Sequence, residues 1–328
     1  MICPDMNEIL IREDEHTIRM HEIAEPYIRD RREIRTLYRE RNHPINCVRY
    51  TPDNPQAVIV LSHGFLESVK KYREMIYYFL HGGFVVYAFD HSEHGKSYRL
   101  TDDLSKVHVD DWHRWCDDLI YVAQFTRKAY PDLPLYLYGH SMGGGIGAAV
   151  LCLVPDLFSR AVLSSPMIRP QTGGVPWCLT RLLCNLTCAI GRKENYAPAN
   201  YPYDSNEPFA DSASLSEERF EYYMEQRRND PLYQMSGATW GWLQNAVRMN
   251  TFIQKTGWKE IRCPVLLFQA DDEQRVVNSQ QDLFIKKISA NCDARLIHMP
   301  ETKHEIFNSH DDVIVRYLDE IFKFFQTG

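Results

Sequence analysis

Residues 135–144, LYLYGHSMGG, decide the fold of this chain. An apolar and aromatic run ends at Tyr138, and a serine framed by glycines then leads into small residues up to Val150. This order predicts a strand, a sharp turn and a helix, with the Ser141 side chain presented at the turn. The strained backbone of such a turn leaves no room for side chains at Gly139 and Gly143. We therefore predict that Ser141 is a nucleophile.

Short apolar runs recur on both sides of this stretch, and their lengths suit buried strands. Longer helix-compatible segments lie between most of them. This alternation predicts an α/β fold with a mostly parallel central sheet and helices on both faces. We expect functional side chains at the carboxyl ends of the strands. The predicted strands are residues 57–61, 84–89, 135–138, 161–163, 265–268 and 294–297, and the helical segments are 71–81, 110–129 and 144–153.

The alternation breaks between about residues 165 and 261, where helical patterns continue and no convincing strand is seen. We therefore divide the chain into an N-terminal extension (1–45), a first core part (46–165), a helical cap (166–260) and a second core part (261–328). One cap helix should not face water, because burying each large apolar side chain contributes roughly 1.5 to 3 kcal/mol. It either packs on the core or also serves as a lid. Its apolar residues are Val175, Trp177, Leu179, Leu182, Leu183, Leu186 and Ile190.

A nucleophilic serine needs a base within hydrogen-bond reach and a carboxylate that orients the base. Three carboxylates follow the predicted strand 265–268, and the spacing favours Glu273 as the acid, with Asp272 as the alternative. We predict His304 as the base, because it lies in a loop that can deliver its imidazole to the serine. We expect His298 to be packed in the sheet and His310 to lie on the surface.

An acyl-transfer site also needs N–H donors for the developing oxyanion. The residue after the nucleophile, Met142, supplies one. The loop after the first core strand contains Gly64, which allows a close backbone approach, so Phe65 is the candidate for the second. For His63, in the same loop, a structural role is favoured over a role as base.

Composition excludes several function classes. The chain has 328 residues and a formal net charge of −7, so nucleic acid is disfavoured as a partner. The first 26 residues mix charges and contain no apolar stretch, so we expect no signal peptide and a cytoplasmic location. The nine cysteines include no CxxC pair and are expected to be reduced. The pairs Cys184 with Cys188 and His91 with His94 are expected to be structural, and no metal or cofactor is predicted.

An arginine-rich segment precedes the first predicted strand. Six arginines alternate there with acidic and apolar residues, which predicts a solvated helix face with salt bridges. The alternative is a patch that docks on anionic lipid headgroups, and the protein would then be peripheral on the inner membrane. The arginines are Arg29, Arg31, Arg32, Arg35, Arg39 and Arg41.

From about Cys47 to Phe325 the chain resembles the α/β-hydrolase fold, within it the branch of monoacylglycerol lipases and bacterial lysophospholipases. The pattern is most similar to that of the bacterial lysophospholipases associated with the inner membrane. The motifs that carry the resemblance are His63-Gly64-Phe65, FDHSEHGKS at 89–97, GHSMGG at 139–144 and His304-Glu305, together with Glu67-Ser68, Lys71-Tyr72, Asn229-Asp230-Pro231, TWGW at 239–242 and the acidic cluster before Val276.

Two positions depart from the pattern of this branch. Ser92 and Glu93 stand where relatives have a small or basic residue and glycine, and Glu273 stands where most have aspartate. Glutamate is chemically adequate, since the acid only orients and stabilises the imidazolium.

The residues and the resemblance together predict a serine hydrolase that cleaves the fatty-acyl ester of a single-chain lipid through an acyl-enzyme. The substrate of choice is a lysophospholipid, with the cap lining a passage for the acyl chain. The alternatives are a monoacylglycerol lipase, a general carboxylesterase, an iminopeptidase-type peptidase with an acidic anchor at Glu217, Glu218 or Glu221, and a non-catalytic binding protein.

Overall fold

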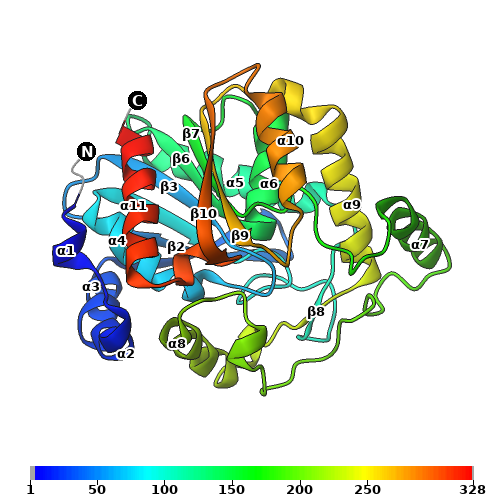
Figure 1. Ribbon diagram of the computed structural model, residues 1–328, viewed down its shortest axis with the longest axis horizontal. Coiled ribbons are helices and arrows are strands. Elements are labelled where there is room, and N and C mark those ends of the chain that lie inside the picture. The colour runs from blue at the N-terminus through cyan, green and yellow to red at the C-terminus, as the bar shows by residue number, and fades with distance from the viewer. Residues whose placement is uncertain (1–3, 327–328) are drawn as a thin grey trace.

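A central eight-stranded sheet organises the molecule, which a computed structural model describes for residues 4–326 (Figure 1). Its strand order is β1-β2-β4-β3-β6-β7-β9-β10. The strands from β4 to β10 run parallel, whereas β1 and β2 pair antiparallel. The sheet strands are β1 Arg32–Glu40, β2 His43–Tyr50, β3 Ala57–Ser62, β4 Phe84–Phe89, β6 Leu135–His140, β7 Arg160–Ser164, β9 Val265–Asp272 and β10 Ala294–Lys303; β5 Lys106–Val107 and β8 Gly237–Ala238 form a separate pair.

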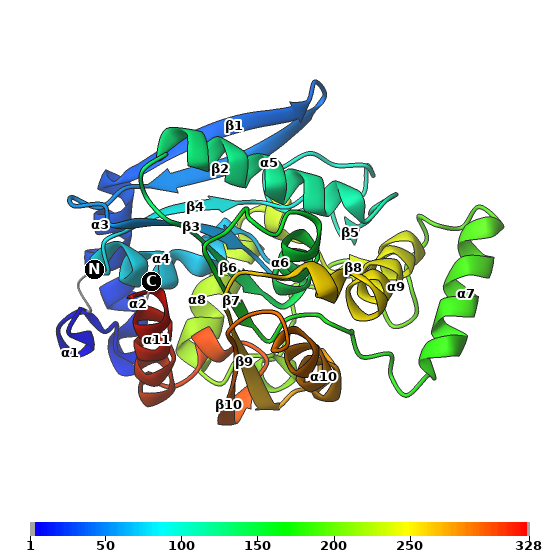
Figure 2. The same ribbon diagram turned by 90° about the horizontal axis from the view of Figure 1, so that it is seen from above.

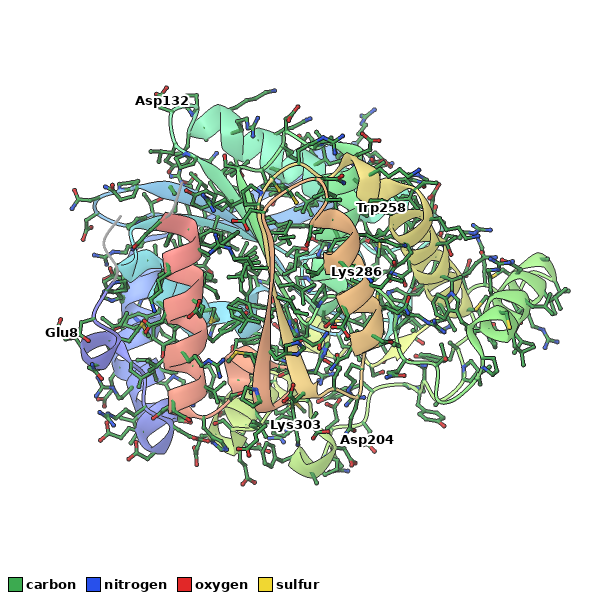
Figure 3. The ribbon with its side chains drawn as sticks, turned by 45° about the horizontal axis from the view of Figure 1, so that its top comes forward. Glu8, Asp132, Asp204, Trp258, Lys286 and Lys303 are labelled. Atoms are coloured by element: carbon green, nitrogen blue, oxygen red, sulfur yellow. The ribbon has the colours of Figure 1, made fainter. Side chains whose placement is uncertain are left out.

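Helices cover both faces of the sheet, and side chains fill the space between them (Figures 2 and 3). Helices α4 and α11 pack with N-terminal residues in one apolar core, whereas α5, α6 and α10 contribute to the other. The predicted fold class is therefore confirmed. The helices are α1 Met6–Ile9, α2 His16–Arg19, α3 Glu25–Asp30, α4 Arg73–His81, α5 His113–Ala129, α6 Ser141–Leu153, α7 Trp177–Ala189, α8 Glu217–Arg228, α9 Trp240–Lys255, α10 Asn278–Ile288 and α11 Asp311–Gln326.

The six predicted strands are confirmed, although β9 continues four residues and β10 six residues beyond the predicted ends. The helix expected in the arginine-rich segment is wrong for residues 32–40; of its six arginines, Arg29 alone lies in a helix, α3. Residues 32–40 form β1, an edge strand paired with β2. The three-residue spacing of Ile34 and Leu37 fits a helix, but pairing along β2 satisfies the backbone and overrides this local pattern. The segment assigned to an N-terminal extension therefore contributes a whole strand and the start of another to the core sheet.

The expected salt bridges of this segment are present on the strand. Arg35 pairs with Glu33 at 2.5 Å, and Arg39 Nε donates to the buried Asp118 at 2.7 Å. Charged residues on an edge strand discourage pairing with another chain. Arg31 also pairs with Asp53, at 3.0 Å, so carboxylates engage several of the arginines that an anionic membrane would need.

The segment between β7 and β9 carries three helices on the site side of the core. Helix α7 stands apart from the sheet beside α9, whereas α8 lies against the N-terminal segment (Figures 1 and 2). The prediction that α7 avoids water is wrong: Leu182 is 53% exposed, Leu186 55% and Ile190 69%. The short strand β8 also lies in this segment, where no strand was expected.

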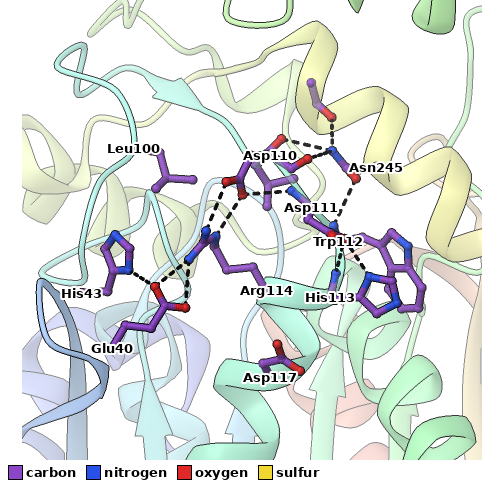
Figure 4. Close-up of polar contacts among 12 residues, drawn as sticks. Glu40, His43, Leu100, Asp110, Asp111, Trp112, His113, Arg114, Asp117 and Asn245 are labelled. Carbon is purple, nitrogen blue, oxygen red and sulfur yellow. Dashed lines mark hydrogen bonds and ion pairs between the residues drawn. The ribbon is translucent and has the colours of Figure 1, made fainter.

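Asn245 of helix α9 bonds to the loop before α5 (Figure 4). Asn245 Oδ1 accepts from Trp112 N at 3.0 Å, and its Nδ2 donates to Val109 O at 3.1 Å. Arg114 then connects the same loop to the β1–β2 hairpin, since it contacts Asp110 at 2.9 Å and Glu40 at 3.3 Å. These hydrogen bonds join the segment between β7 and β9 to a loop that the core sheet supports, in addition to the apolar packing of α9 on the core.

Candidate active site

Ser141 lies at the sharp turn that the sequence predicts. It is the first residue of α6, directly after β6, and its φ is +50°, a region that residues with side chains rarely adopt. A Cβ at Gly143 would lie 2.2 Å from Ser62 O, and one at Gly139 would lie 2.9 Å from Gly143 O. Both glycines are therefore required by close backbone approach.

Two hydrogen bonds join Ser141, His304 and Glu273 in one chain. His304 Nε2 lies 2.8 Å from Ser141 Oγ, and His304 Nδ1 lies 2.7 Å from Glu273 Oε2. Since a carboxylate only accepts, Nδ1 carries the proton and Nε2 is free to accept the serine proton. Ser141 and His304 are 8% and 6% exposed, so the hydrogen bonds lie in a largely water-excluded place.

Backbone donors fix the Glu273 carboxylate. Its Oε1 accepts from Arg275 N at 2.7 Å and from Val276 N at 3.2 Å. Burial alone would raise its pKa, but the interaction with His304 and these backbone bonds lower the pKa below the usual value, so the group is an anion. Asp272, the alternative acid, is exposed at the end of β9, and the amide of Gln274 lies 3.4 Å from it. The geometry therefore favours Glu273.

The two predicted oxyanion donors lie at the ends of β3 and β6. Met142 is in the first turn of α6, where backbone N–H groups have no partner within the helix. Phe65 follows β3, and its ring packs 4.6 Å from that of Trp242 in α9. Gly64, just before it, donates its N–H to Glu67 Oε2 at 2.6 Å. The loop that carries Phe65 is thus fixed from both the core and the cap.

Three buried histidines support this loop. His63 Nδ1 donates to Gly64 O at 2.8 Å, and its Nε2 accepts from His91 N at 2.9 Å. His94 Nδ1 donates to Ser92 O, and its Nε2 accepts from Leu66 N at 3.3 Å. Burial lowers the pKa of all three rings, so they are neutral. His63 therefore has the structural role that the sequence favours.

The other singled-out residues lie elsewhere. His298 is in β10, but its side chain is exposed, since β10 is an edge strand, and the expectation that it is packed is wrong. His310 is on the surface and contacts Glu13 at 2.8 Å. Cys184 is buried in α7 and Cys188 partly so. Within residues 4–326 the structure brings together no cluster of three metal-binding side chains; Cys3 lies outside this range.

Sequence reasoning assigned no role to a pair beside the site, Glu67 and Lys71. Both residues belong to the motifs that carry the family resemblance. Their spacing of four residues is that of an ion pair along a helical turn, and they lie 3.1 Å apart. The spacing indicates the Glu67–Lys71 ion pair. It carries no information about Glu305, which contacts Lys71 from a loop far away in the sequence.

Comparison with known proteins places the chain in a family. Residues 53–311 match the model described as serine aminopeptidase, S33. The chain belongs to this family. The resemblance to α/β hydrolases of the monoacylglycerol lipase and lysophospholipase branch is confirmed.

Two relatives of this S33-family chain are named as lipid hydrolases. It is 29% identical to lysophospholipase L2 of Escherichia coli strain K12 over 243 residues, which cover 74% of this chain and 71% of that protein. It is 26% identical to a monoacylglycerol lipase of Mycolicibacterium smegmatis, over 83% of this chain and 89% of the relative.

Solved structures share its fold. A soluble variant of the monoglyceride lipase of Saccharomyces cerevisiae superimposes with a TM-score of 0.70 at 19% identity, covering 89% of this chain and 93% of that one. A carboxyl esterase of Bacillus coagulans gives 0.71 at 19% identity, covering 90% and 97%. At this identity the likeness concerns the fold alone.

Proposed function

We propose that this protein hydrolyses the fatty-acyl ester of a single-chain lipid, with a lysophospholipid as the preferred substrate and a monoacylglycerol as the alternative. The observation that carries the proposal is the hydrogen-bonded chain Ser141–His304–Glu273 at a turn with positive φ. The names of the two relatives support a carboxylic ester hydrolase that acts on lipids. They leave the headgroup open.

In the proposed mechanism Ser141 Oγ attacks the acyl carbonyl while His304 Nε2 takes its proton. Glu273 stabilises the imidazolium, and the N–H groups of Phe65 and Met142 bind the oxyanion. His304 then protonates the departing alcohol, which leaves an acyl group on Ser141. Water attacks this ester with His304 again as base, and the fatty acid and the free serine result. These steps use protein groups and water alone.

The acidic residues of α8 bear on the choice between a lipid esterase and a peptidase. An aminopeptidase of this fold would need an acidic side chain facing the site to bind the substrate amine. Glu217, Glu218 and Glu221 are all exposed on α8, and Glu221 pairs with Arg228 at 3.0 Å. Their position argues against such an anchor, although the family model is described by a peptidase activity.

The first experiment measures fatty-acid release from lysophosphatidylethanolamine, lysophosphatidylcholine and monoacylglycerol. Wild type is compared with Ser141→Ala and with Ser279→Ala, which changes an exposed serine of α10. Loss of the nucleophile should reduce turnover by about a millionfold, and the control should match wild type. If fatty acid is released from monoacylglycerol alone, the substrate is a monoacylglycerol and not a lysophospholipid. Activity that survives Ser141→Ala would contradict the proposed mechanism. Cleavage of acetyl esters in preference to long-chain esters would contradict the lipid substrate.

We also propose that the protein is cytoplasmic and contacts the membrane peripherally through α7. Its exposed apolar residues form a continuous helical surface of the kind that lies in a lipid interface. In residues 4–326 no helix has both the length and the apolar composition needed to span a bilayer. The exposed apolar residues are Leu179, Leu182, Leu183 and Leu186 of α7, with Val175 and Ile190 just beyond its ends.

A further inference from the structure

A buried chain of charges lies behind the candidate active site. Lys71 Nζ contacts Glu67 Oε1 at 3.1 Å and Glu305 Oε1 at 2.5 Å. The three side chains are 9%, 5% and 13% exposed. Charges at this depth are retained only when they are paired, so each carboxylate depends on the one ammonium.

Glu67 holds the loop that carries Phe65. Its Oε2 accepts from Gly64 N and from Tyr72 OH, each at 2.6 Å. Burial by itself would raise the pKa of Glu67, but the charge of Lys71 and the other contacts lower it to about 2, so the carboxylate is ionised. Because Gly64 immediately precedes Phe65, the position of Glu67 sets the position of the Phe65 N–H.

Glu305 is at the opposite end of the chain of charges and directly follows His304. Its Oε2 accepts from Asn308 Nδ2 at 2.9 Å, and its backbone N–H donates to Ala213 O in the cap segment at 2.9 Å. Burial would lower the pKa of Lys71, but Glu305 and Glu67 raise it, so Lys71 is a cation. One ammonium therefore connects the loop of the base to the loop of the oxyanion donor.

We propose that Lys71 is a positioning residue that sets the distance between His304 and the Phe65 N–H through Glu305 and Glu67. This inference rests on the proposed function. Without the ammonium, the carboxylates of Glu67 and Glu305 lose their shared partner, and the loops that carry them separate or rearrange. A displacement of about 1 Å in such a site costs about a hundredfold in rate. Substrate binding in the cap should change little, because Lys71 itself touches no reacting atom.

The test compares Lys71→Met, Lys71→Arg and the control Lys70→Met in steady-state hydrolysis of a lysophospholipid. Lys70 is the neighbouring lysine, and its ion-pair partner is Asp230, at 3.2 Å, rather than Glu67 or Glu305. In Lys71→Met we expect kcat to fall about a hundredfold with KM within about threefold. Lys71→Arg should recover kcat to within about tenfold, and Lys70→Met should keep the wild-type kcat. A kcat for Lys71→Met within about threefold of wild type would overturn the proposal, as would an equal loss in Lys70→Met.

A second variant covers the case in which Lys71→Met fails to fold. The triple variant Lys71→Met, Glu67→Gln, Glu305→Gln carries no buried charge at this place and should fold, since neutral replacement of a buried ion pair is often tolerated. The proposal expects a kcat about a hundredfold below wild type in the folded triple variant. Wild-type kcat in that variant, or a triple variant that does not fold, would count against a role in positioning and for a role in stability alone.

A substrate-independent measurement separates this inference from the proposed function. A fluorophosphonate probe reacts with an activated serine whatever the natural substrate, so the rate of Ser141 labelling reports the base and the oxyanion donors. Labelling should be about a hundredfold slower in Lys71→Met. Fast labelling of wild type and of Lys71→Met alike would overturn only the inference. Absence of labelling in wild type would contradict the serine mechanism and the inference together.

Discussion

Helices α7 and α8 belong to the same cap segment, yet their environments are the reverse of what their compositions suggest. The leucine-rich helix α7 buries only Thr180 and Cys184. The charged helix α8 buries Arg219, which is 2% exposed, and Arg227, together with Tyr222, Tyr223 and Met224. In this molecule the apolar content of a helix does not by itself decide its burial; the helix also needs a matching partner in the core.

The partner of α8 is a polar network that the N-terminal segment completes. Arg219 donates to Glu74 Oε2 of α4 at 3.1 Å, to Asp311 Oδ1 of α11 at 3.1 Å and to Ile11 O at 2.7 Å. His16 Nε2 lies 2.9 Å from Glu74 Oε2. Helix α7 contacts α9, for example through a 2.9 Å hydrogen bond from Gln244 to Asn185, and leaves its leucines uncovered.

The largest effect is expected when the α8 anchor is removed. Arg219→Met leaves Glu74 and Asp311 without their common cation, and breaking one side of a buried charge pair costs about 3 to 5 kcal/mol of unfolding free energy. Denaturation in urea measures it. Arg228→Met is the matched control on the same helix: Arg228 pairs with Glu221 on the surface, and its loss should cost at most about 1 kcal/mol. Equal losses of unfolding free energy in Arg219→Met and Arg228→Met would contradict the conclusion that buried Arg219 anchors α8.

Acid should weaken the same anchor. Burial alone would raise the pKa of Glu74, but the charge of Arg219 and the contact with His16 lower it to about 2. A carboxyl with a lowered pKa stabilises the fold above its unfolded value, 4.5, and that contribution is lost as pH falls from 4.5 toward 2. We expect a loss of about 3 kcal/mol across this window. Urea denaturation of Glu74→Gln should lack this component, and an identical pH dependence in both proteins would contradict the assignment.

A smaller effect is expected at the second contact of α8 with the N-terminal segment. Tyr222 OH donates to Glu25, which also pairs with Arg73 of α4. A hydrogen bond to a charged group contributes about 2 kcal/mol, so Tyr222→Phe should lower the unfolding free energy by that amount. Tyr201→Phe, at a tyrosine that is 70% exposed, should be neutral. If Tyr222→Phe leaves the unfolding free energy unchanged, Arg219 alone anchors α8 to the N-terminal segment.

The smallest change in stability is expected on α7. Replacing both Leu182 and Leu186 by serine should alter the unfolding free energy by less than about 0.5 kcal/mol, because both side chains are exposed. The same variant should lose binding to vesicles containing anionic lipid in a flotation assay. Leu283→Ser, at an exposed leucine of α10, is the control and should bind as wild type. Vesicle binding that survives in the double variant would contradict membrane contact through α7.

The sequence predicted most of the sheet, since buried strands read as short apolar runs between turn residues. The prediction failed at β1, because an edge strand with charged residues on its exposed side does not read as a short apolar run. For the candidate site, the glycine-framed turn predicted Ser141, the position in a loop predicted His304, and spacing favoured Glu273. It left Asp272 open, since adjacent carboxylates differ only in the direction of their side chains, which the end of β9 sets.

The sequence by itself determined the local features: a serine framed by glycines, the strands that follow one another into a parallel sheet, and the order of the candidate nucleophile, acid and base. These depend on residue type and short-range spacing. Only the tertiary structure decided which side chains lie together from distant segments: Glu273 rather than Asp272 on His304, Lys71 between Glu67 and Glu305, and the burial of α8 in place of α7. Such pairings depend on contacts between residues far apart in the chain, and neither periodicity nor composition encodes which of several similar groups will meet.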